Sequence, residues 1–340
     1  MQRTSLLVAS AAASLACIGY VLVCGRQHDT RISDSLRGRT SDPDAPAITV
    51  RTLDVGQGDA TYIHNGDSRI IIDGGPDEGR FGALLDSLGL NHTTIDAVIL
   101  THQHYDHYNG LLALFESGRA IKVRYFFEDK DPSTASTIVR LRDSVMARVR
   151  RDGLIYRSTD DPCGTGSAIC TITMRGGAQL HLLQPLPPPQ KANNRSVAVK
   201  LVGPDSASFT MWLAGDAERD AIHYFERAGY SRTPGMRVNV LKADHHGSCN
   251  GVTPRYLALL HPSWVIASLG PHNDYGHMHA QAKAMYAAAG IPWYRTDQNG
   301  TVTIRSPGIP NGGYTVSVDH GTNNMDGPSD RMSRQPECAE

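Results

Sequence analysis

Short apolar segments separated by turn residues fill the chain between residues 48 and 318. Most are rich in Val, Ile and Leu, which is typical of β-strands that are buried on at least one face. Segments with an apolar residue at every third or fourth position lie between them, and this period predicts helices. The expected strands are 48–55, 61–64, 70–72, 97–100, 123–127, 197–202, 209–213, 238–241 and 264–267, and the expected helices are 81–88, 136–151, 220–228, 254–260 and 280–289.

Many short strands with interspersed helices favour a layered α/β (α+β) fold in which helices cover sheets. The composition, 40% apolar and 20% charged, is typical of a globular protein with a substantial core. No long linker divides residues 48–318, so we expect one domain there. Residues 25–47 are polar and rich in Arg, Asp and Ser, which predicts a linker, and the polar residues 319–340 predict a disordered tail.

An uncharged run at residues 6–24 precedes this domain, and Arg3 precedes the run. The run is slightly long for the core of a signal peptide and just long enough to span a bilayer, so residues 1–24 are either a signal peptide or a membrane anchor. Cys17 follows Ser14-Leu15-Ala16, which leaves lipidation open as well. All three interpretations predict an exported domain that is periplasmic, secreted or anchored facing outward.

The overall charge gives no attraction to nucleic acid or to anionic membranes, because the formal net charge is −1 and the pI is about 6.9. Binding to DNA would therefore need a local patch of cations. The candidates are Arg119, Lys122 and Arg124, which follow the histidine-rich run described next, and Lys191 and Arg195 in a Pro-rich loop. Scattered solvated charges are an equally open interpretation of these five residues.

Histidines gather directly after the expected strand 97–100. In an extended segment His102 and His104 point the same way, and the following turn can bring Asp106 and His107 to a second point nearby. Imidazole and carboxylate are ligands that suit zinc, iron or manganese. Burying these groups without a metal would be costly. The run therefore predicts a metal site.

The run 101–107 (THQHYDH) resembles the metal-binding signature of the metallo-β-lactamase superfamily. Further motifs appear in the order expected for that family at 53–60 (LDVGQGDA), 73–76 (DGGP), 213–216 (LAGD), 241–248 (LKADHHGS) and 275–277 (YGH). Together they resemble the hydrolase domain of ComEC-type competence proteins and of free-standing relatives that include cell-wall phosphorylcholine esterases. The resemblance covers residues 48–318 and implies an αββα sandwich with its metals at the edge between two β-sheets.

The resemblance also implies two divalent metal ions, zinc or manganese, and their ligands. His102 and His104 would hold the first ion, and Asp106 and His107 the second. Asp216 would bridge both ions. Asp106 and Asp216 are the expected catalytic residues. Two ions that share a carboxylate can clamp a phosphoryl group on its attacking and leaving sides.

Five further residues are expected around the ions. Asp73 would orient ligands through hydrogen bonds. His245 and His246 cannot both face one metal in an extended segment, so His245 is favoured as a ligand of the second ion and His246 as a substrate-binding residue. His277 resembles a family position that faces substrate and donates a hydrogen bond to a phosphate oxygen. The family commonly supplies a third histidine to the first ion, but the corresponding loop has none, and Asn194 in that loop is expected to contact the ion or the substrate.

The expected activity is hydrolysis of a phosphodiester by a metal-bound hydroxide. The substrate would be DNA, or else a cell-wall or small-molecule phosphodiester. A β-lactamase-like hydrolase and a non-enzymatic, metal-stabilised binding module stay open, since a fold does not fix a function. The N-terminal segment could contact a membrane, and the sequence indicates no protein partner.

Two cysteines flank a Gly-rich loop, Cys163 and Cys170, and export predicts a disulfide between them. Free buried thiols are the alternative, and Cys249 and Cys338 stay unassigned. The bond is expected to stabilise the protein by about 2–4 kcal/mol. Peptide mapping under non-reducing conditions tests it, and two free thiols in protein recovered from the periplasm or the medium would refute it.

Overall fold

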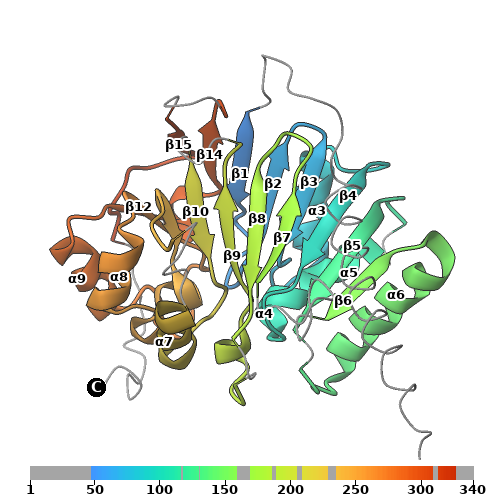
Figure 1. Cartoon of the computed structure of the whole chain (residues 1–340), viewed down its shortest axis with the longest axis horizontal. Coiled ribbons are helices and arrows are strands. Elements are labelled where there is room, and N and C mark those ends of the chain that lie inside the picture. The colour runs from blue at the N-terminus through green and yellow to red at the C-terminus, as the bar shows by residue number, and fades with distance from the viewer. Residues whose placement is uncertain are drawn as a thin grey trace, which may run out of the picture.

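Two β-sheets lie face to face at the centre of the protein, with helices on both outer sides (Figure 1). The computed structural model describes residues 47–115, 118–129, 131–158, 169–185, 189–204, 209–228, 235–308 and 313–326. The order of layers is the αββα sandwich expected from the sequence.

The first sheet has eight strands in the order β15-β14-β1-β2-β3-β4-β5-β6. Neighbours from β15 to β3 are antiparallel, and those from β3 to β6 are parallel. The carboxyl ends of β3, β4 and β5 therefore meet at one edge of the sheet. The strands are β1 (Ile48–Thr52), β2 (Thr61–Asn65), β3 (Ser68–Ile72), β4 (Thr94–Ile99), β5 (Lys122–Glu128), β6 (Ile155–Ser158), β14 (Val302–Ser306) and β15 (Thr315–Val318).

The second sheet has seven strands in the order β13-β12-β11-β10-β9-β8-β7. Its antiparallel part runs from β7 to β10 and its parallel part from β10 to β13. The strands are β7 (Ile169–Thr173), β8 (Gln179–Leu183), β9 (Ala198–Val202), β10 (Thr210–Leu213), β11 (Val240–Lys242), β12 (Trp264–Ala267) and β13 (Trp293–Arg295).

Helices cover the outer face of each sheet through separate apolar clusters. The first sheet packs on α3 (Glu78–Ser87), α5 (Leu112–Phe115) and α6 (Ser136–Asp152), and the second on α7 (Arg219–Ala228), α8 (Pro254–Leu260) and α9 (Ala280–Ala288). The helical period predicted for α6 is confirmed, because its buried residues are Ile138, Leu141 and Val145. The remaining short helices are α4 (Tyr105–Tyr108), η1 (Asn109–Leu111), η2 (Asn193–Arg195), η3 (Asp244–Gly247), η4 (Cys249–Gly251) and α10 (Thr296–Asn299).

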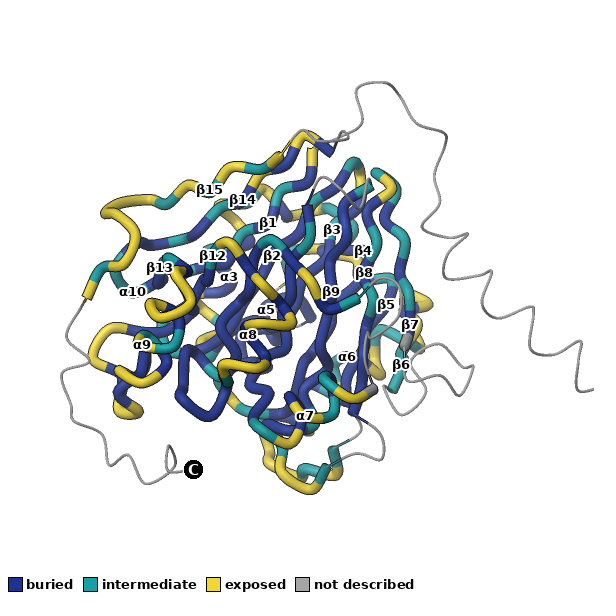
Figure 2. Tube along the Cα trace, turned by 60° about the vertical axis from the view of Figure 1, so that its left-hand side comes forward, coloured by how far each residue is buried: buried dark blue, intermediate teal, exposed yellow. Residues whose placement is uncertain are grey.

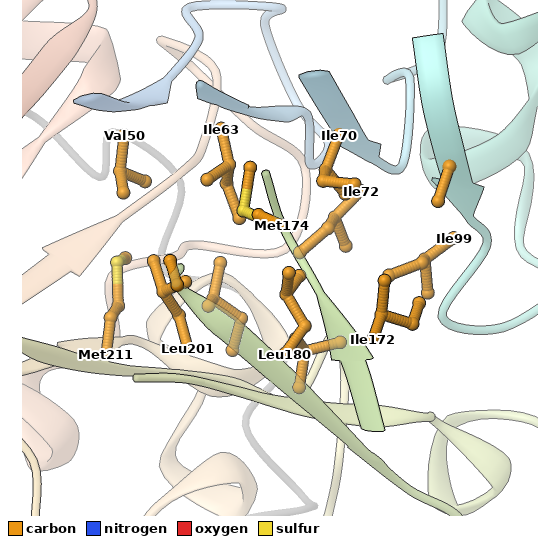
Figure 3. Close-up of a cluster of buried hydrophobic side chains, with 14 of the residues drawn as sticks. Val50, Ile63, Ile70, Ile72, Ile99, Ile172, Met174, Leu180, Leu201 and Met211 are labelled. Carbon is orange, nitrogen blue, oxygen red and sulfur yellow. The ribbon is translucent and has the colours of Figure 1, made fainter. Parts of the chain in front are cut away.

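A third apolar cluster fills the space between the sheets. Figure 3 shows Ile63, Ile70 and Ile72 of the first sheet facing Leu180 and Leu201 of the second. The strands form a mostly buried centre, and exposed residues gather in loops and on the outer faces of helices (Figure 2). Both sheets are therefore held rigidly by packing on two faces.

Part of the predicted disordered tail is ordered in the described residues. Asn324 exchanges two hydrogen bonds of 2.9 Å with the backbone of Trp293, and the side chain of Asn299 donates to the carbonyls of His320 and Thr322. Residues 319–326 thus belong to the folded domain. The prediction looked for apolar periodicity, whereas hydrogen bonds of polar side chains hold this segment.

Several predicted features lie outside the described residues. These are the leader at 1–24, most of the linker at 25–47, and residues 327–340. Cys163 and Cys338 also lie outside the described residues, so the pairing of Cys163 with Cys170 stays a prediction. Among the described helices, none has the length and apolar character needed to cross a membrane.

Truncating a side chain between the sheets should destabilise the fold strongly. Leu180 is 0% exposed, so Leu180→Ala is expected to lower the free energy of unfolding by about 2–5 kcal/mol through the cavity it leaves. Leu259 on α8 is 39% exposed and serves as the control, since Leu259→Ala should change it by about 0.5 kcal/mol or less. Urea denaturation measures both, and equal effects would contradict tight packing between the sheets.

Candidate metal centre

The residues predicted to form a metal site come together where parallel strands of both sheets end. Asp73 follows β3, the run 102–107 follows β4, Asp216 follows β10, and His245 and His246 follow β11. Carboxyl ends of parallel strands meet at one edge, and loops from that edge converge. The strand order therefore assembles residues that are distant in the sequence.

Two groups of described side chains that contain Asp216 hold their ligand atoms within 4.8 Å of one another, beside a third such group of Asp59, Asp73 and His107. Asp216 is a member of both, which is the geometry expected of a carboxylate between two ions. The first group is His102, His104 and Asp216, and the second is Asp106, His107, Asp216 and His246.

Four ligand atoms in these groups are buried and have no hydrogen-bond partner: Nε2 of His102, His107 and His246, and Oδ1 of Asp216. The Nε2 atoms of His107 and His246 lie 3.2 and 3.4 Å from Asp216 Oδ1. The Nε2 atom of His102 lies 3.7 Å from Asp216 Oδ2. Burying polar atoms without a hydrogen-bond partner raises the free energy of the folded protein. Their convergence, and their chemistry of imidazole and carboxylate, fit divalent cations.

Hydrogen bonds on the far side of two imidazoles fix their orientation. His107 Nδ1 lies 2.9 Å from Asp73 Oδ2, and His246 Nδ1 donates to the carbonyl of Ser268 at 2.8 Å. Asp73 also accepts from the backbone and hydroxyl of Thr101, both at 2.8 Å. A histidine that donates from Nδ1 keeps the lone pair of Nε2 for a metal. Asp73 thus lies behind the ligands, where the sequence predicted it.

Burial and mutual contact set the charges of this cluster. Burial lowers the pKa of His102 well below its usual value, so that this imidazole is neutral. Burial alone would raise the pKa of Asp216, but the imidazoles of His246, His107 and His245 together hold that pKa well below its usual value. An ionised carboxylate surrounded by imidazoles is a suitable donor set for a cation.

The structure brings both His245 and His246 to Asp216, although the sequence favoured only His245 as a ligand. His246 is 1% exposed and belongs to the second ligand group, and His245 Nε2 lies 3.8 Å from Asp216 Oδ2 while its Nδ1 lies 3.0 Å from Asn250 Oδ1. The prediction assumed an extended segment, but the φ angles are 48° at His245 and 55° at His246. Two successive left-handed residues turn both rings toward the same space.

Asn194 is not placed as the sequence predicted. Its amide oxygen accepts hydrogen bonds from the backbone N–H groups of Glu218 and Ala221, both at 3.2 Å, and its amide nitrogen donates to Asp220 at 3.3 Å. These bonds satisfy N–H groups at the start of α7, which otherwise have no partner within the helix. The oxygen expected to contact an ion or a substrate is therefore engaged in capping a helix.

His277, the other residue expected to face substrate, borders the centre. Its ring centroid lies 5.2 Å from that of His245 and 5.7 Å from that of His246. Its Nδ1 is buried without a hydrogen-bond partner. Burial and the neighbouring imidazoles lower the pKa of His277 to about 2, so the ring is neutral and carries one N–H donor.

Four of the five cations considered for a DNA groove have acidic partners among the described residues. Lys122 begins β5, whose opposite end faces the metal centre. The other four are neutralised within the protein, because each is paired with an acidic residue. The pairs are Arg119–Asp86, Arg124–Asp96, Lys191–Glu218 and Arg195–Asp129.

Sequence reasoning missed a buried ion pair beside the centre. Lys242 Nζ donates to Asp59 Oδ2 at 2.6 Å and to the carbonyl of Ala243 at 2.9 Å. The other oxygen of Asp59 lies 3.2 Å from His246 Nδ1. The motif at 53–60 contains Asp59, but in the sequence it indicated only the family resemblance.

The turn that contains Asp59 also contacts the loop 102–107. The backbone N–H of Asp59 donates to the carbonyl of Asp106 at 3.1 Å. A Cβ atom at Gly58 would lie 2.3 Å from that carbonyl oxygen, so this approach requires glycine. On the other side, Gln103 donates to Glu128 and to the carbonyl of Asp129 at 2.9 and 2.8 Å. The loop is thus held from two sides.

Comparison with known proteins agrees with this geometry. A model of the metallo-β-lactamase superfamily matches residues 53–130. ComE operon protein 3 of Bacillus subtilis (strain 168) is 25% identical over 281 residues, which are 75% of this chain and 33% of that protein. Recombination protein 2 of Haemophilus influenzae is 27% identical over 242 residues, 69% of this chain and 26% of that protein. The chain thus spans a third or less of the length of these two relatives.

Among solved structures, the metallo-β-lactamase fold protein YhfI from Bacillus subtilis is similar with a TM-score of 0.47 and 13% identity, over 76% of this chain and 99% of that one.

Breaking the Lys242–Asp59 pair should destabilise the protein. Both side chains are buried, so Lys242→Met leaves a carboxylate without its counterion and is expected to cost about 3–5 kcal/mol. The double variant Asp59→Leu/Lys242→Met removes both charges and should recover part of that loss. Urea denaturation is the measurement and Lys122→Met, at an exposed position, is the control. A cost for Lys242→Met no larger than that of the control would contradict the pair's importance.

Proposed function

We propose that this chain is a hydrolase of the metallo-β-lactamase superfamily, whose model matches residues 53–130, and that it hydrolyses phosphodiesters with two divalent metal ions. The observation that carries the proposal is the set of buried, unpartnered ligand atoms around Asp216. His102 and His104 would hold one ion, and Asp106, His107 and His246 the other, with Asp216 between them. Ions bound there would act as Lewis acids on a phosphoryl oxygen and lower the pKa of a water ligand.

The least buried members of the cluster mark the side from which substrate reaches it. Asp106 is 26% exposed and His245 17% exposed, whereas His102 and His107 are 0% exposed. His104 is also partly exposed. A substrate therefore meets Asp106, His104 and His245 first. Asp106 is placed at this side to accept the proton that hydrolysis releases.

Two imidazoles outside the ligand groups favour a phosphodiester among possible substrates. His245 and His277 have ring centroids 5.2 Å apart and border the same space as the ligands. Imidazole N–H groups can donate to the non-bridging oxygens of a phosphate, on which negative charge is concentrated. Among phosphodiesters, similarity to the relative named Recombination protein 2 supports a nucleic acid.

The native metals and the location of the protein are parts of the same proposal. Imidazole-rich ligand groups that share a carboxylate favour zinc or manganese. Export rests on the uncharged run at residues 6–24 alone, which would carry the domain out of the cytoplasm as a signal peptide or an anchor.

Removing the shared carboxylate should remove both ions. Asp216→Ala is expected to lose most bound metal and to reduce turnover of bis(4-nitrophenyl) phosphate by about 100-fold or more, since the loss of residues that only orient a ligand already costs about 10- to 100-fold. Metal analysis and a spectrophotometric assay measure the two effects. Asp143→Ala, on the exposed face of α6, is the matched control. Normal metal content and turnover in Asp216→Ala would exclude the proposed centre.

A panel of substrates tests the reaction class on the same preparation. The metal-loaded protein should cleave bis(4-nitrophenyl) phosphate and single-stranded DNA but not the β-lactam nitrocefin. Cleavage of nitrocefin alone would replace the proposal by a β-lactamase-like activity. Two bound metals with no turnover of any member would favour a metal-stabilised binding module.

A further inference from the structure

A column of aromatic rings leads from the metal centre to the solvent. His246, in the second ligand group, lies 5.7 Å from His277 with an angle of 28° between ring planes. His277 in turn lies 5.5 Å from Tyr275, with an angle of 21°. Near-parallel rings at these distances are stacked. Tyr275 is the outermost ring of this column.

The side chain of Tyr275 is open to solvent. Tyr275 is 59% exposed, and its ring stacks on His277 on one side. The described residues contain six exposed large apolar side chains, of which two are aromatic, Tyr275 and Tyr105. Both lie beside the centre, since Tyr105 stands between His104 and Asp106. Exposed apolar groups concentrated at a site indicate binding.

Hydrogen bonds hold the loop of Tyr275 in place. Asn273 accepts from the backbone N–H of His277 at 2.8 Å and donates to the carbonyl of the same residue at 2.7 Å. His279 Nε2 lies 3.0 Å from the carbonyl of Tyr275. The ring is thus presented in a fixed position, which lowers the entropy lost when a ligand stacks on it.

We propose that Tyr275 is a stacking platform for the nucleobase next to the scissile phosphate, so that the substrate is an unpaired nucleic-acid strand. This inference rests on the proposed phosphodiesterase function. A flat base continues the column of flat rings, and stacking on an exposed aromatic ring is how proteins bind single strands without sequence preference. A base within a duplex is covered on both faces by its neighbours and cannot reach the ring without leaving the stack.

A nucleobase suits this surface better than a quaternary ammonium group does. Such cations are bound by several ring faces that form a cage. Tyr275 offers a single face in line with two imidazoles, and their parallel planes match a planar ligand. Stacking also supplies affinity without cations, which agrees with the internal pairing of the four cations described above.

The test compares two strands with the same phosphates, a short oligothymidylate and an abasic strand of the same length. The metal-loaded wild-type protein should show a kcat/KM about 10-fold or more higher for the base-bearing strand. In Tyr275→Ala this ratio should fall to near 1, while Tyr275→Phe, which keeps the ring, should retain it. Leu259→Ala is the control at a distant exposed position and should keep the wild-type ratio.

A binding measurement separates the subsite from the reaction. Fluorescence anisotropy of both labelled strands in the presence of a chelator reports affinity without cleavage, and the wild type should bind the base-bearing strand about 5- to 100-fold more tightly. Equal binding and equal cleavage of the two strands would overturn the subsite and leave the phosphodiesterase intact. A preference that persists in Tyr275→Ala would also overturn it. Failure to cleave any diester would refute the proposed function, and the binding ratio would then decide the subsite alone.

A phosphorylcholine substrate tests whether the ring of Tyr275 binds a quaternary ammonium group instead of a nucleobase. If 4-nitrophenyl phosphorylcholine is cleaved in a Tyr275-dependent manner and the base-bearing strand is not preferred, the ring binds a quaternary ammonium group and the nucleobase proposal is wrong.

Discussion

The ionised carboxylate of Asp216, buried among imidazoles, is the interaction on which the rest of the structure depends. The ring nitrogens of His107 and His246 lie 3.2 and 3.4 Å from one oxygen, and that of His102 lies 3.7 Å from the other. Such a cluster cannot be buried alone, because each unpartnered atom is costly. Loops from both sheets must therefore stay in register to within a few tenths of an ångström, and only strands packed on two faces provide that rigidity.

Contacts that hold the loops in place explain the presence of residues that are not themselves in the two ligand groups around Asp216. Asp73 joins the end of β3 to His107, and the Lys242–Asp59 pair joins the turn after β1 to the end of β11. Each contact links two strand ends that meet at the same edge. Gly58 is required because the backbone of that turn lies against the metal-binding loop. A change at these positions would act on the ligands by displacing the loops that carry them.

The sequence predicted the layered fold because the parallel strands are continuous apolar runs, such as β4 and β12. It missed β6, β7, β8, β13, β14 and β15, which lie at or next to the ends of the two sheets. The His245–His246 assignment could not be made because it depends on the sign of φ, which the local sequence does not reveal. The charge pairs were equally hidden, since Arg195 and Asp129 are 66 residues apart in the sequence. Local backbone angles and contacts between remote loops are thus the features of the site that the sequence does not reveal.

The centre divides into a buried part and an exposed part with different physical constraints. Side chains such as His102 and His107 are 0% exposed and fixed by neighbours on several sides, so their replacement would disturb the fold as well as any ion that they hold. Tyr105 and Tyr275 are 53% and 59% exposed on the loops that carry the ligands and the bordering His277, so their replacement would disturb the core packing less. Selectivity can therefore vary through exposed loop residues while the buried ligand set stays the same, which is why one fold can serve different substrates. For this chain, the substrate must be inferred from the exposed rings and not from the ligands.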